Sequence, residues 1–398
     1  MNIQGELAIQ CCIVCSEVDF DKIILGKSLA DASDFRYLNE RCTKFCYELT
    51  NCKKCGHVSI QTDNPCWLPT RKYDFIKYGE PTEHYPFVAE ILKSLEIDFS
   101  DASIHTFSYK DFQLANFLRA QLGIDDANLV DWLGCSDDWL PTTQTGTSVT
   151  EPQPLRGFFS EIEKSAKTHK IVLITRFFDH VANQELLKKM ISVASSTVHV
   201  VFDLNDYERL FALGTLEFIW NERRNLFRRL HLGHILTREN QRFSIFTYES
   251  REVSPTLTGV ISHLLPKCDE NYQTSTPNLN NSDLCTRLTS LRNRWSKHLI
   301  NNHKLGIIGA SHKGISLAQF ILDSGTIYSL HDDKEILRYK KAPVSSPLGF
   351  HSVSGFDFSD YTHIAITTTL TIAAKIVPKL RAGGYRGEIL DFDCHKLD

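Results

Sequence analysis

The pattern of apolar and polar positions divides most of the chain into alternating helices and strands. Apolar residues recur at helical spacing over residues 86–97, which predicts a helix there. Further along, strands are predicted over residues 102–107, 128–134, 170–178 and 198–204, and helices over residues 112–123, 157–169 and 183–195. Such alternation is typical of a parallel sheet covered by helices.

A second unit of the same kind follows a polar break. The first pattern continues to about residue 265, and the Asn-rich stretch 271–284 is a candidate linker. Beyond the break, residues 284–302 are predicted to be helical. Residues 304–325 then have the order strand, glycine turn, helix, and so open another α/β unit.

Composition and charge narrow the protein class. A chain of 398 residues with 42% hydrophobic residues is expected to form more than one domain. The net charge of -4 comes without long blocks of one sign, which argues against nucleic acid and anionic membranes as partners. The first residues have no secretory pattern, and no apolar run reaches the roughly 18 residues of a membrane span. We therefore expect a cytoplasmic protein.

Cysteines are concentrated near the beginning of the chain. Residues 1–66 hold eight of the twelve cysteines, and a cytosolic setting favours metal binding or reduced thiols over disulfides. Cys12 and Cys15 form one CxxC pair and Cys52 and Cys55 another, with Gly56 available for a tight turn. Four thiolates predict a closed, structural zinc site, against the alternative of small buried apolar residues. The remaining cysteines here are expected to be ordinary thiols: Cys11, Cys42, Cys46 and Cys66.

Six blocks of the sequence together resemble one known family. They are the CxxC pair 12–15 and the segments 45–61, 77–92, 158–187, 218–227 and 305–314. In these blocks and in their order, the chain resembles the three-part sugar C-methyltransferases. The resemblance implies an α/β fold with a zinc-binding module (residues 1–75), a class I methyltransferase domain of the Rossmann-like type (76–268) and a C-terminal Rossmann-like α/β domain (285–398).

The resemblance also implies a chemistry. Known members deprotonate a nucleotide-activated keto-deoxysugar next to its carbonyl, and the carbon then attacks the methyl group of S-adenosylmethionine (SAM). The expected ligands are thus structural zinc, SAM and a nucleotide sugar, in deoxysugar or surface-polysaccharide biosynthesis.

The SAM loop departs from the family pattern. The family's acidic and glycine positions correspond here to Thr106 and Ser108, and Phe112 replaces the last glycine, where its ring would fill cofactor space. Asp111 fits the pattern. Asp131 follows the next predicted strand, where an acid usually binds the ribose hydroxyls.

The loop of the family's general base is also altered. Trp220, Asn221, Glu222 and Arg223 occupy the positions of its aromatic, His or Glu, Glu and His residues. Glu222 is thus kept, and Arg223 replaces the proposed base. Because a guanidinium stays protonated at physiological pH, Arg223 cannot accept the proton.

Other residues offer alternatives around this loop. His180 matches a family position near the cofactor and is a candidate base, and His231 and His234 are weaker ones. Arg223 and Arg224 suit an anion clamp for a sugar diphosphate, or else belong to a solvated basic helix face. A stacking groove for nucleic acid is disfavoured, because no wider basic surface supports it.

The C-terminal unit carries a glycine-rich turn. Gly306, Gly309 and Gly314 lie between strand and helix, and two acids follow the next strand at Asp332 and Asp333, but the spacing departs from the dinucleotide pattern. The resemblance implies that this domain helps to enclose the sugar. His312 and Lys313 are its candidate substrate contacts, or else exposed polar residues at a helix start.

Three hypotheses follow from these residues. The first is an active SAM-dependent methyltransferase with an altered base, supplied perhaps by a partner protein. The second is a pseudo-methyltransferase that binds a nucleotide sugar as a subunit or scaffold. The third is an enzyme of another class that uses a dinucleotide in the C-terminal domain.

Overall fold

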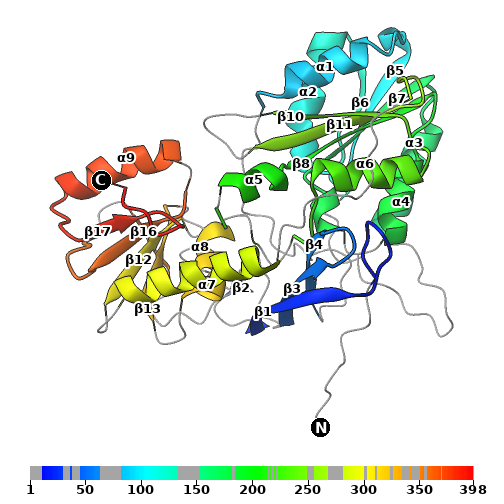
Figure 1. Cartoon of the computed structure of the whole chain (residues 1–398). Coiled ribbons are helices and arrows are strands. Elements are labelled where there is room, and N and C mark those ends of the chain that lie inside the picture. Colours follow the sequence, from blue (N-terminus) through cyan, green and yellow to red (C-terminus); the bar gives the residue numbers. More distant parts are fainter. Residues whose placement is uncertain are drawn as a thin grey trace.

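The fold was analysed in a computed structural model of the chain (Figure 1). The described residues are 11–29, 36–37, 45–62, 82–132, 153–181, 184–213, 215–216, 219, 223–248, 255–267, 281–299, 303–309, 312–322, 326–333, 340–341, 350–353, 356–368 and 370–397. Trp220, Asn221 and Glu222 lie outside them, as do Cys42, Cys66 and the side chain of His312.

The central domain is built on a six-stranded sheet in the order β10-β11-β8-β7-β5-β6. Its strands are β5 (Ala102–Thr106), β6 (Asp126–Asn128), β7 (His169–Thr175), β8 (Val198–Asn205), β10 (Phe243–Tyr248) and β11 (Thr256–Ile261). β5 to β8 are parallel, whereas β11 is antiparallel to both β8 and β10. The last strand, β11, thus runs antiparallel between β8 and its hairpin partner β10, which is the strand arrangement of class I methyltransferases. The expected α/β fold with a methyltransferase-like Rossmann domain is confirmed.

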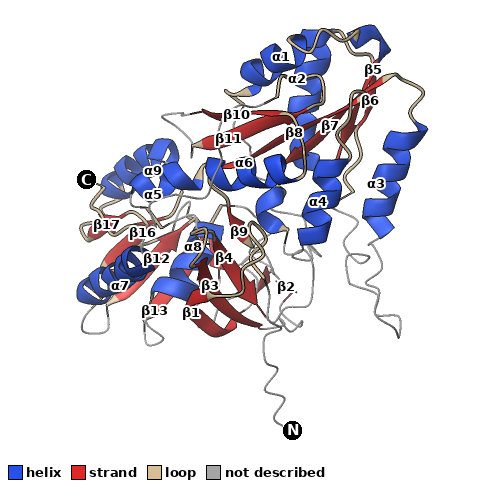
Figure 2. Ribbon diagram, turned by 45° about the vertical axis from the view of Figure 1, so that its right-hand side comes forward, coloured by secondary structure: helices blue, strands red, loops and turns tan. Residues whose placement is uncertain are grey.

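Helices cover both faces of this sheet (Figure 2). They are α1 (Tyr85–Lys93), α2 (Phe112–Leu122), α3 (Gln153–Lys164), α4 (Gln184–Ser192), α5 (Tyr207–Leu213) and α6 (Arg229–Arg238). Two separate apolar cores lie on the two faces. Gly123 ends α2 with a φ of 69°, as the sequence predicts.

Two predicted elements are displaced along the sequence. The strand predicted at 128–134 is formed by Asp126–Asn128, because those residues pair with β5. The helix predicted at 157–169 begins at Gln153 and ends at Lys164, so the strand β7 starts earlier, at His169. Gly157 lies inside α3, and the Trp132 ring fills the space where its side chain would be.

The N-terminal module is a small antiparallel sheet. Its strands are β1 (Phe20–Leu29), β3 (Phe45–Cys52), β4 (Val58–Thr62) and, from the central domain, β9 (Asn225–Leu226). β9 pairs with β4, so a strand from the arginine-rich segment completes the module's sheet. A separate pair joins β2 (Arg36–Tyr37) to β14 (Lys340–Lys341).

The C-terminal domain follows helix α7 (Asn281–His298), whose first residues overlap the predicted linker. Its parallel sheet has the order β15-β13-β12-β16-β17. The strands are β12 (Lys304–Ile308), β13 (Ile327–His331), β15 (Phe350–His351), β16 (His363–Ile366) and β17 (Glu388–Leu390), with helices α8 (His312–Ser316) and α9 (Leu370–Ala382). One apolar core continues from the N-terminal module through the central sheet to α7 and β12.

Within the described ranges, no helix combines the length and the apolar character that crossing a membrane requires.

Candidate functional site

The four CxxC cysteines converge on one point. Cys12 Sγ lies 3.6 Å from Cys55 Sγ, Cys15 Sγ lies 3.5 Å from Cys52 Sγ, and all four sulfurs are within 4.8 Å of one another. A tetrahedral zinc ion with Zn–S bonds of about 2.3 Å needs sulfurs about 3.8 Å apart. The cluster therefore fits a tetrahedral metal such as zinc, as the sequence predicts.

The two CxxC turns have matching backbones. The amide of Ser16 donates to the carbonyl of Cys12, and that of Gly56 to the carbonyl of Cys52, both at 2.8 Å. Ser16 and Gly56 have φ values of 61° and 68°, so each pair of cysteines is followed by a left-handed residue. The hydrogen bonds among the four thiols lower the pKa of Cys15 to about 7 and lower that of Cys52, whereas the pKa values of Cys12 and Cys55 are raised, so the geometry is what indicates a metal site.

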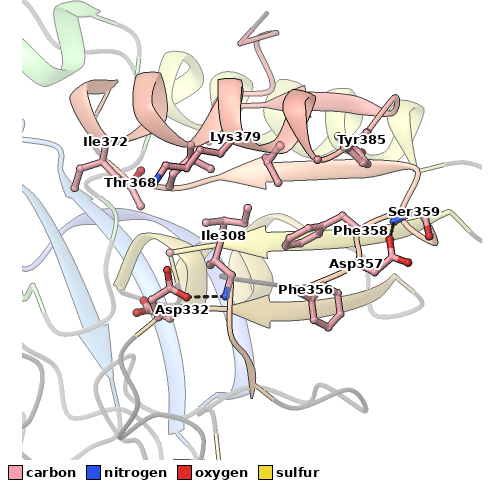
Figure 3. A pocket seen from close by; sticks show the side chains of 17 residues that line it. Ile308, Asp332, Phe356, Asp357, Phe358, Ser359, Thr368, Ile372, Lys379 and Tyr385 are labelled. Atoms are coloured by element: carbon pink, nitrogen blue, oxygen red, sulfur yellow. Dashed lines mark hydrogen bonds between the residues drawn. The ribbon is translucent and has the colours of Figure 1, made fainter.

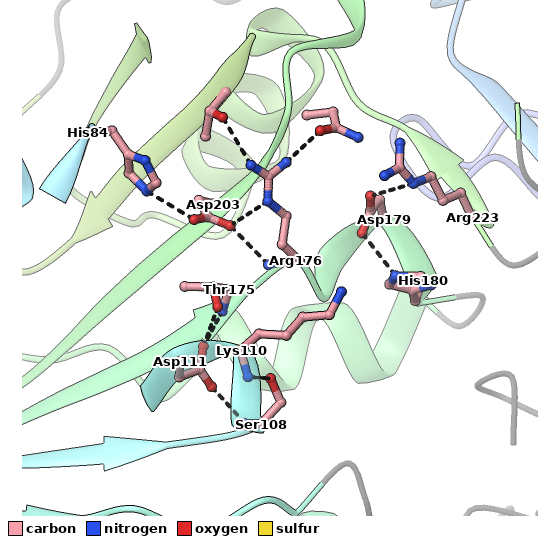
Figure 4. Close-up of polar contacts among 12 residues, drawn as sticks. His84, Ser108, Lys110, Asp111, Thr175, Arg176, Asp179, His180, Asp203 and Arg223 are labelled. Carbon is pink, nitrogen blue, oxygen red and sulfur yellow. Dashed lines mark hydrogen bonds and ion pairs between the residues drawn. The ribbon is translucent and has the colours of Figure 1, made fainter. Parts of the chain in front are cut away.

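A second polar cluster lies at the carboxyl ends of β7 and β8, on the edge where parallel sheets bind ligands (Figure 4). Asp203, in β8, is buried. It accepts a hydrogen bond from the amide of Arg176 at 3.0 Å and contacts Nε2 of His84, also at 3.0 Å. Burial opposes ionisation, but Arg176 and His84 outweigh it and lower the pKa of Asp203.

The backbone of Arg176 is held in a left-handed conformation that residues other than glycine rarely adopt. Its φ is 52°, and its guanidinium donates to Asn205 Oδ1 at 2.5 Å and to Thr256 Oγ1 at 3.0 Å. Such left-handed positions cost free energy and persist only where the surroundings impose them. The network of Asp203 thus holds the end of β7 rigid.

Asp179 is the second buried carboxylate of this edge. It lies in a 3-10 turn after β7, Phe178–His180, and accepts a hydrogen bond from Tyr207 Oη at 2.9 Å. Arg223 Nε lies 3.6 Å from Asp179 Oδ2, and His180 Nε2 lies 3.7 Å from Asp179 Oδ1. Burial disfavours its charge, yet His180, Arg223 and Lys110 together lower the pKa of Asp179. A carboxylate so stabilised is a weak proton acceptor.

The predicted SAM-loop residues make hydrogen bonds within the chain. Asp111 Oδ2 accepts from the amides of Phe107 at 2.7 Å and Ser108 at 2.6 Å, and its Oδ1 accepts from the amide and hydroxyl of Thr175 at 2.7 and 2.6 Å. Burial raises the pKa of Asp111 to about 7, while these donors act against the rise. Four donors therefore tie the loop to the end of β7.

The rest of this loop also packs inward. The hydroxyl of Thr106 lies 3.0 Å from the carbonyl of Val130, and Ser108 Oγ accepts from the amide of Lys110 at 3.2 Å. Phe107 is fully buried, with its ring 4.5 Å from that of Phe177. Phe112, expected in cofactor space, begins α2 and is half-buried, and Asp131 is half-buried after β6.

The arginine-rich segment is buried. Arg223, Arg224 and Arg228 are 7%, 3% and 5% exposed, so the solvated basic face predicted as an alternative for Arg223 and Arg224 is wrong. Arg223 faces Asp179, with its guanidinium 5.8 Å from the Tyr207 ring, whereas that of Arg224 lies 5.9 Å from the Tyr47 ring of the N-terminal module.

His231 belongs to the module interface. Its Nε2 lies 3.1 Å from the carbonyl of Cys55, and its Nδ1 lies 3.4 Å from Nδ1 of His57. Burial lowers the pKa of His231 well below its usual value. Of the candidate bases, His180 lies beside Asp179, and His234 is half-buried in α6.

A cavity of about 500 Å³ lies in the C-terminal domain between α9 and the carboxyl end of the sheet (Figure 3). Asp332 and Asp333 both line it, at the edge predicted for a ligand, and Ile308 and Phe358 make part of its apolar wall. Gly309, with a φ of 94°, turns the chain beside it. Lys313 is half-buried in α8, and it is not among the lining residues.

Sequence reasoning missed Asp179, Asp203 and Arg176. The available signal was their position, because each lies within or directly after a strand that ends at the carboxyl edge.

Comparisons with known proteins add little to this picture. No protein-family model and no curated protein matches the chain. Among solved structures, the methyltransferase domain of a bacterial CtHen1-CN is 15% identical, with a TM-score of 0.29, covering 45% of this chain and 97% of its own. Phosphoethanolamine N-methyltransferase 2 of Haemonchus contortus, solved with SAM, is 11% identical, with a TM-score of 0.22, over 77% of this chain and 74% of its own. The central domain has a methyltransferase-like fold on the evidence of its strand order.

Proposed function

We propose that this protein is a methyltransferase-fold subunit that binds a nucleotide-activated sugar and no longer transfers a methyl group from SAM. The observation that carries the proposal is the Asp111 clamp. Its carboxylate accepts four hydrogen bonds from the loop and from β7, where a class I methyltransferase presents its backbone to the cofactor. The amides of Phe107 and Ser108 are therefore already engaged within the chain, and SAM would have to compete with Asp111 for them.

The sugar part of the proposal rests on two supports. The first is the family resemblance of the zinc module, central domain and C-terminal domain. The second is the C-terminal cavity, whose volume of about 500 Å³ is within the range of sites for small ligands. The carboxylates of Asp332 and Asp333 line the cavity where sugar or ribose hydroxyls would bind, and Asp333 Oδ1 also accepts from the hydroxyl of Ser352 and the amide of Val353, both at 2.9 Å. The apolar wall suits a nucleobase. In this reading the cytoplasmic protein acts as a binding subunit or scaffold, with structural zinc in the four-Cys site.

Calorimetry on the full chain tests the proposal. Titration with SAM up to millimolar concentration should give no heat and no thermal shift, whereas one member of a panel of nucleoside diphosphate sugars should give both. Binding of SAM would overturn the proposal that the protein no longer uses this cofactor. Failure of every nucleotide sugar would overturn the substrate class, while leaving the SAM result to be judged separately.

A second candidate is an active methyltransferase with an altered base, and Asp131 favours it. Asp131 follows β6, where class I methyltransferases commonly hold the ribose of SAM, and it is half-buried. This candidate predicts that SAM is converted to S-adenosylhomocysteine when a nucleotide sugar, and any partner protein supplying a base, are present. Asp131→Ala should then lower SAM affinity at least about tenfold, roughly the 1.4 kcal/mol of a lost charged hydrogen bond.

A further inference from the structure

Three side chains with metal-binding atoms meet at the amino edge of the C-terminal sheet, opposite the cavity. His298 ends α7, His363 begins β16 and Glu388 begins β17. His298 Nδ1 lies 2.9 Å from Glu388 Oε2, and His363 Nε2 lies 3.4 Å from the same oxygen. All three ligand atoms lie within 4.8 Å of one another, which is the spread of ligands around one cation.

The hydrogen bonds of His363 turn one lone pair toward this group. The hydroxyl of Thr362 donates to the carbonyl of Lys304 at 3.2 Å, so its oxygen is left to accept from His363 Nδ1 at 3.0 Å. In the tautomer with the proton on Nδ1, Nε2 is free to act as a metal ligand. A second-sphere partner that sets the tautomer in this way is typical of metal-binding histidines.

The resulting arrangement turns two ligand atoms toward the same space. Nε2 of His363 lies 3.4 Å from Glu388 Oε2, and a cation held between them would bond to both. The exposed fractions of 8% for His363, 30% for His298 and 36% for Glu388 leave a path for an ion from solvent.

Neighbouring charged groups leave the ligand oxygen accessible. Lys396 Nζ lies 2.5 Å from Glu388 Oε1. It therefore engages one carboxylate oxygen, and the histidines face the other. His303 lies nearby, with its Nδ1 2.9 Å from the carbonyl of His298, and Lys304 is 3.9 Å from Asp360.

We propose that His298, His363 and Glu388 form a second metal site, for a transition-metal dication such as Zn²⁺. Two imidazoles and one carboxylate suit zinc, cobalt or nickel better than calcium or magnesium, which prefer oxygen ligands alone. Three protein ligands leave one tetrahedral position for water. The ion would join the end of α7 to two strands of the sheet, at the edge away from the predicted ligand cavity, so its role is structural or regulatory.

Zinc binding to the full chain tests this site. Equilibrium dialysis against micromolar Zn²⁺, followed by elemental analysis, should give two zinc ions per wild-type chain and one for His298→Asn and for Glu388→Gln. His395→Asn is the matched control, because His395 also pairs with a carboxylate, that of Asp391 at 3.2 Å, but lies outside the group, and it should keep two.

Cobalt substitution separates the two sites. Loss of the proposed site should leave the intense thiolate absorption of the four-Cys cluster unchanged, which also shows that the variants are folded. His298 is at a partly exposed helix end, so its replacement is the milder change. One zinc ion per wild-type chain, or two in both variants, would overturn the proposal.

Discussion

Arg223 and Arg228 belong to the same short segment, and both are buried, yet they face different kinds of partner. Arg223 lies beside the ionised carboxylate of Asp179 at the edge of the central sheet. Arg228 donates from Nη2 to the carbonyl of Gly56 at 3.2 Å, next to the second CxxC turn. One arginine thus compensates a buried charge, and the other supports the backbone of a metal site.

The difference shows that one buried arginine-rich segment can both neutralise a carboxylate and support a metal-binding turn. Between the two arginines, β9 pairs with β4, and Asn225 lies 3.0 Å from His57. Strand β9 therefore determines which side chains of this segment reach the edge of the central sheet and which reach the N-terminal module. Losing the partner of a charge costs more than losing a donor to a neutral carbonyl, so the two regions should respond unequally.

Removing the metal from the four-Cys cluster should have the largest effect. Bound zinc contributes about 10 to 16 kcal/mol in small zinc modules. Without it, the amides of β3 and β4 should lose hydrogen-exchange protection, while those of β7 and β8 keep theirs. Exchange measured with and without a strong chelator, and in Cys52→Ser, checks this expectation. Cys11→Ser is the control, because Cys11 is exposed and lies outside the cluster. Unchanged protection in chelator would show that the metal is not structural.

Asp179→Asn should be the most damaging single change at the sheet edge. It leaves Arg223 buried beside a neutral amide, and breaking a buried ion pair from one side costs about 3 to 5 kcal/mol. Urea unfolding followed by circular dichroism measures the loss. The double variant Asp179→Asn with Arg223→Met should recover much of it, since the buried positive charge is then removed as well. A loss below about 1 kcal/mol in the single variant would mean that the pair is solvated.

The sequence predicted the parts of the molecule that depend on local spacing. The left-handed Gly56 after the second CxxC pair, and the end of α2 at Gly123, follow from residues next to one another. The sheet-edge network does not. His84 and Asp203 are 119 positions apart, and only the completed sheet brings them together. The strand at 128–134 was misplaced for a similar reason, because pairing with β5 selected Asp126–Asn128.

Arg228→Met should have a smaller effect than Asp179→Asn, and it should be confined to the module. The lost bond leaves the carbonyl of Gly56 without this donor, a cost of about 1 to 3 kcal/mol. Because Gly56 follows Cys55, metal affinity should also fall, by about 10-fold or more. A competition titration with a zinc indicator measures it. Arg242→Met is the matched control, since Arg242 also donates to a carbonyl, that of His263, at an exposed site. Equal effects of the two variants would contradict a role for Arg228 in the metal site.

The smallest expected effect is the part of the acid stability that comes from Asp179. Its folded pKa lies below the unfolded value of about 3.9, so its contribution is fully present above that pH and is lost as the pH falls through the folded pKa. Each unit of that lowering corresponds to about 1.4 kcal/mol. The double variant Asp179→Asn with Arg223→Met should therefore lose less stability than the wild type between pH 5 and about pH 2, measured by urea unfolding at each pH. Parallel curves for the two proteins would show that the charge of Asp179 does not depend on its buried partners.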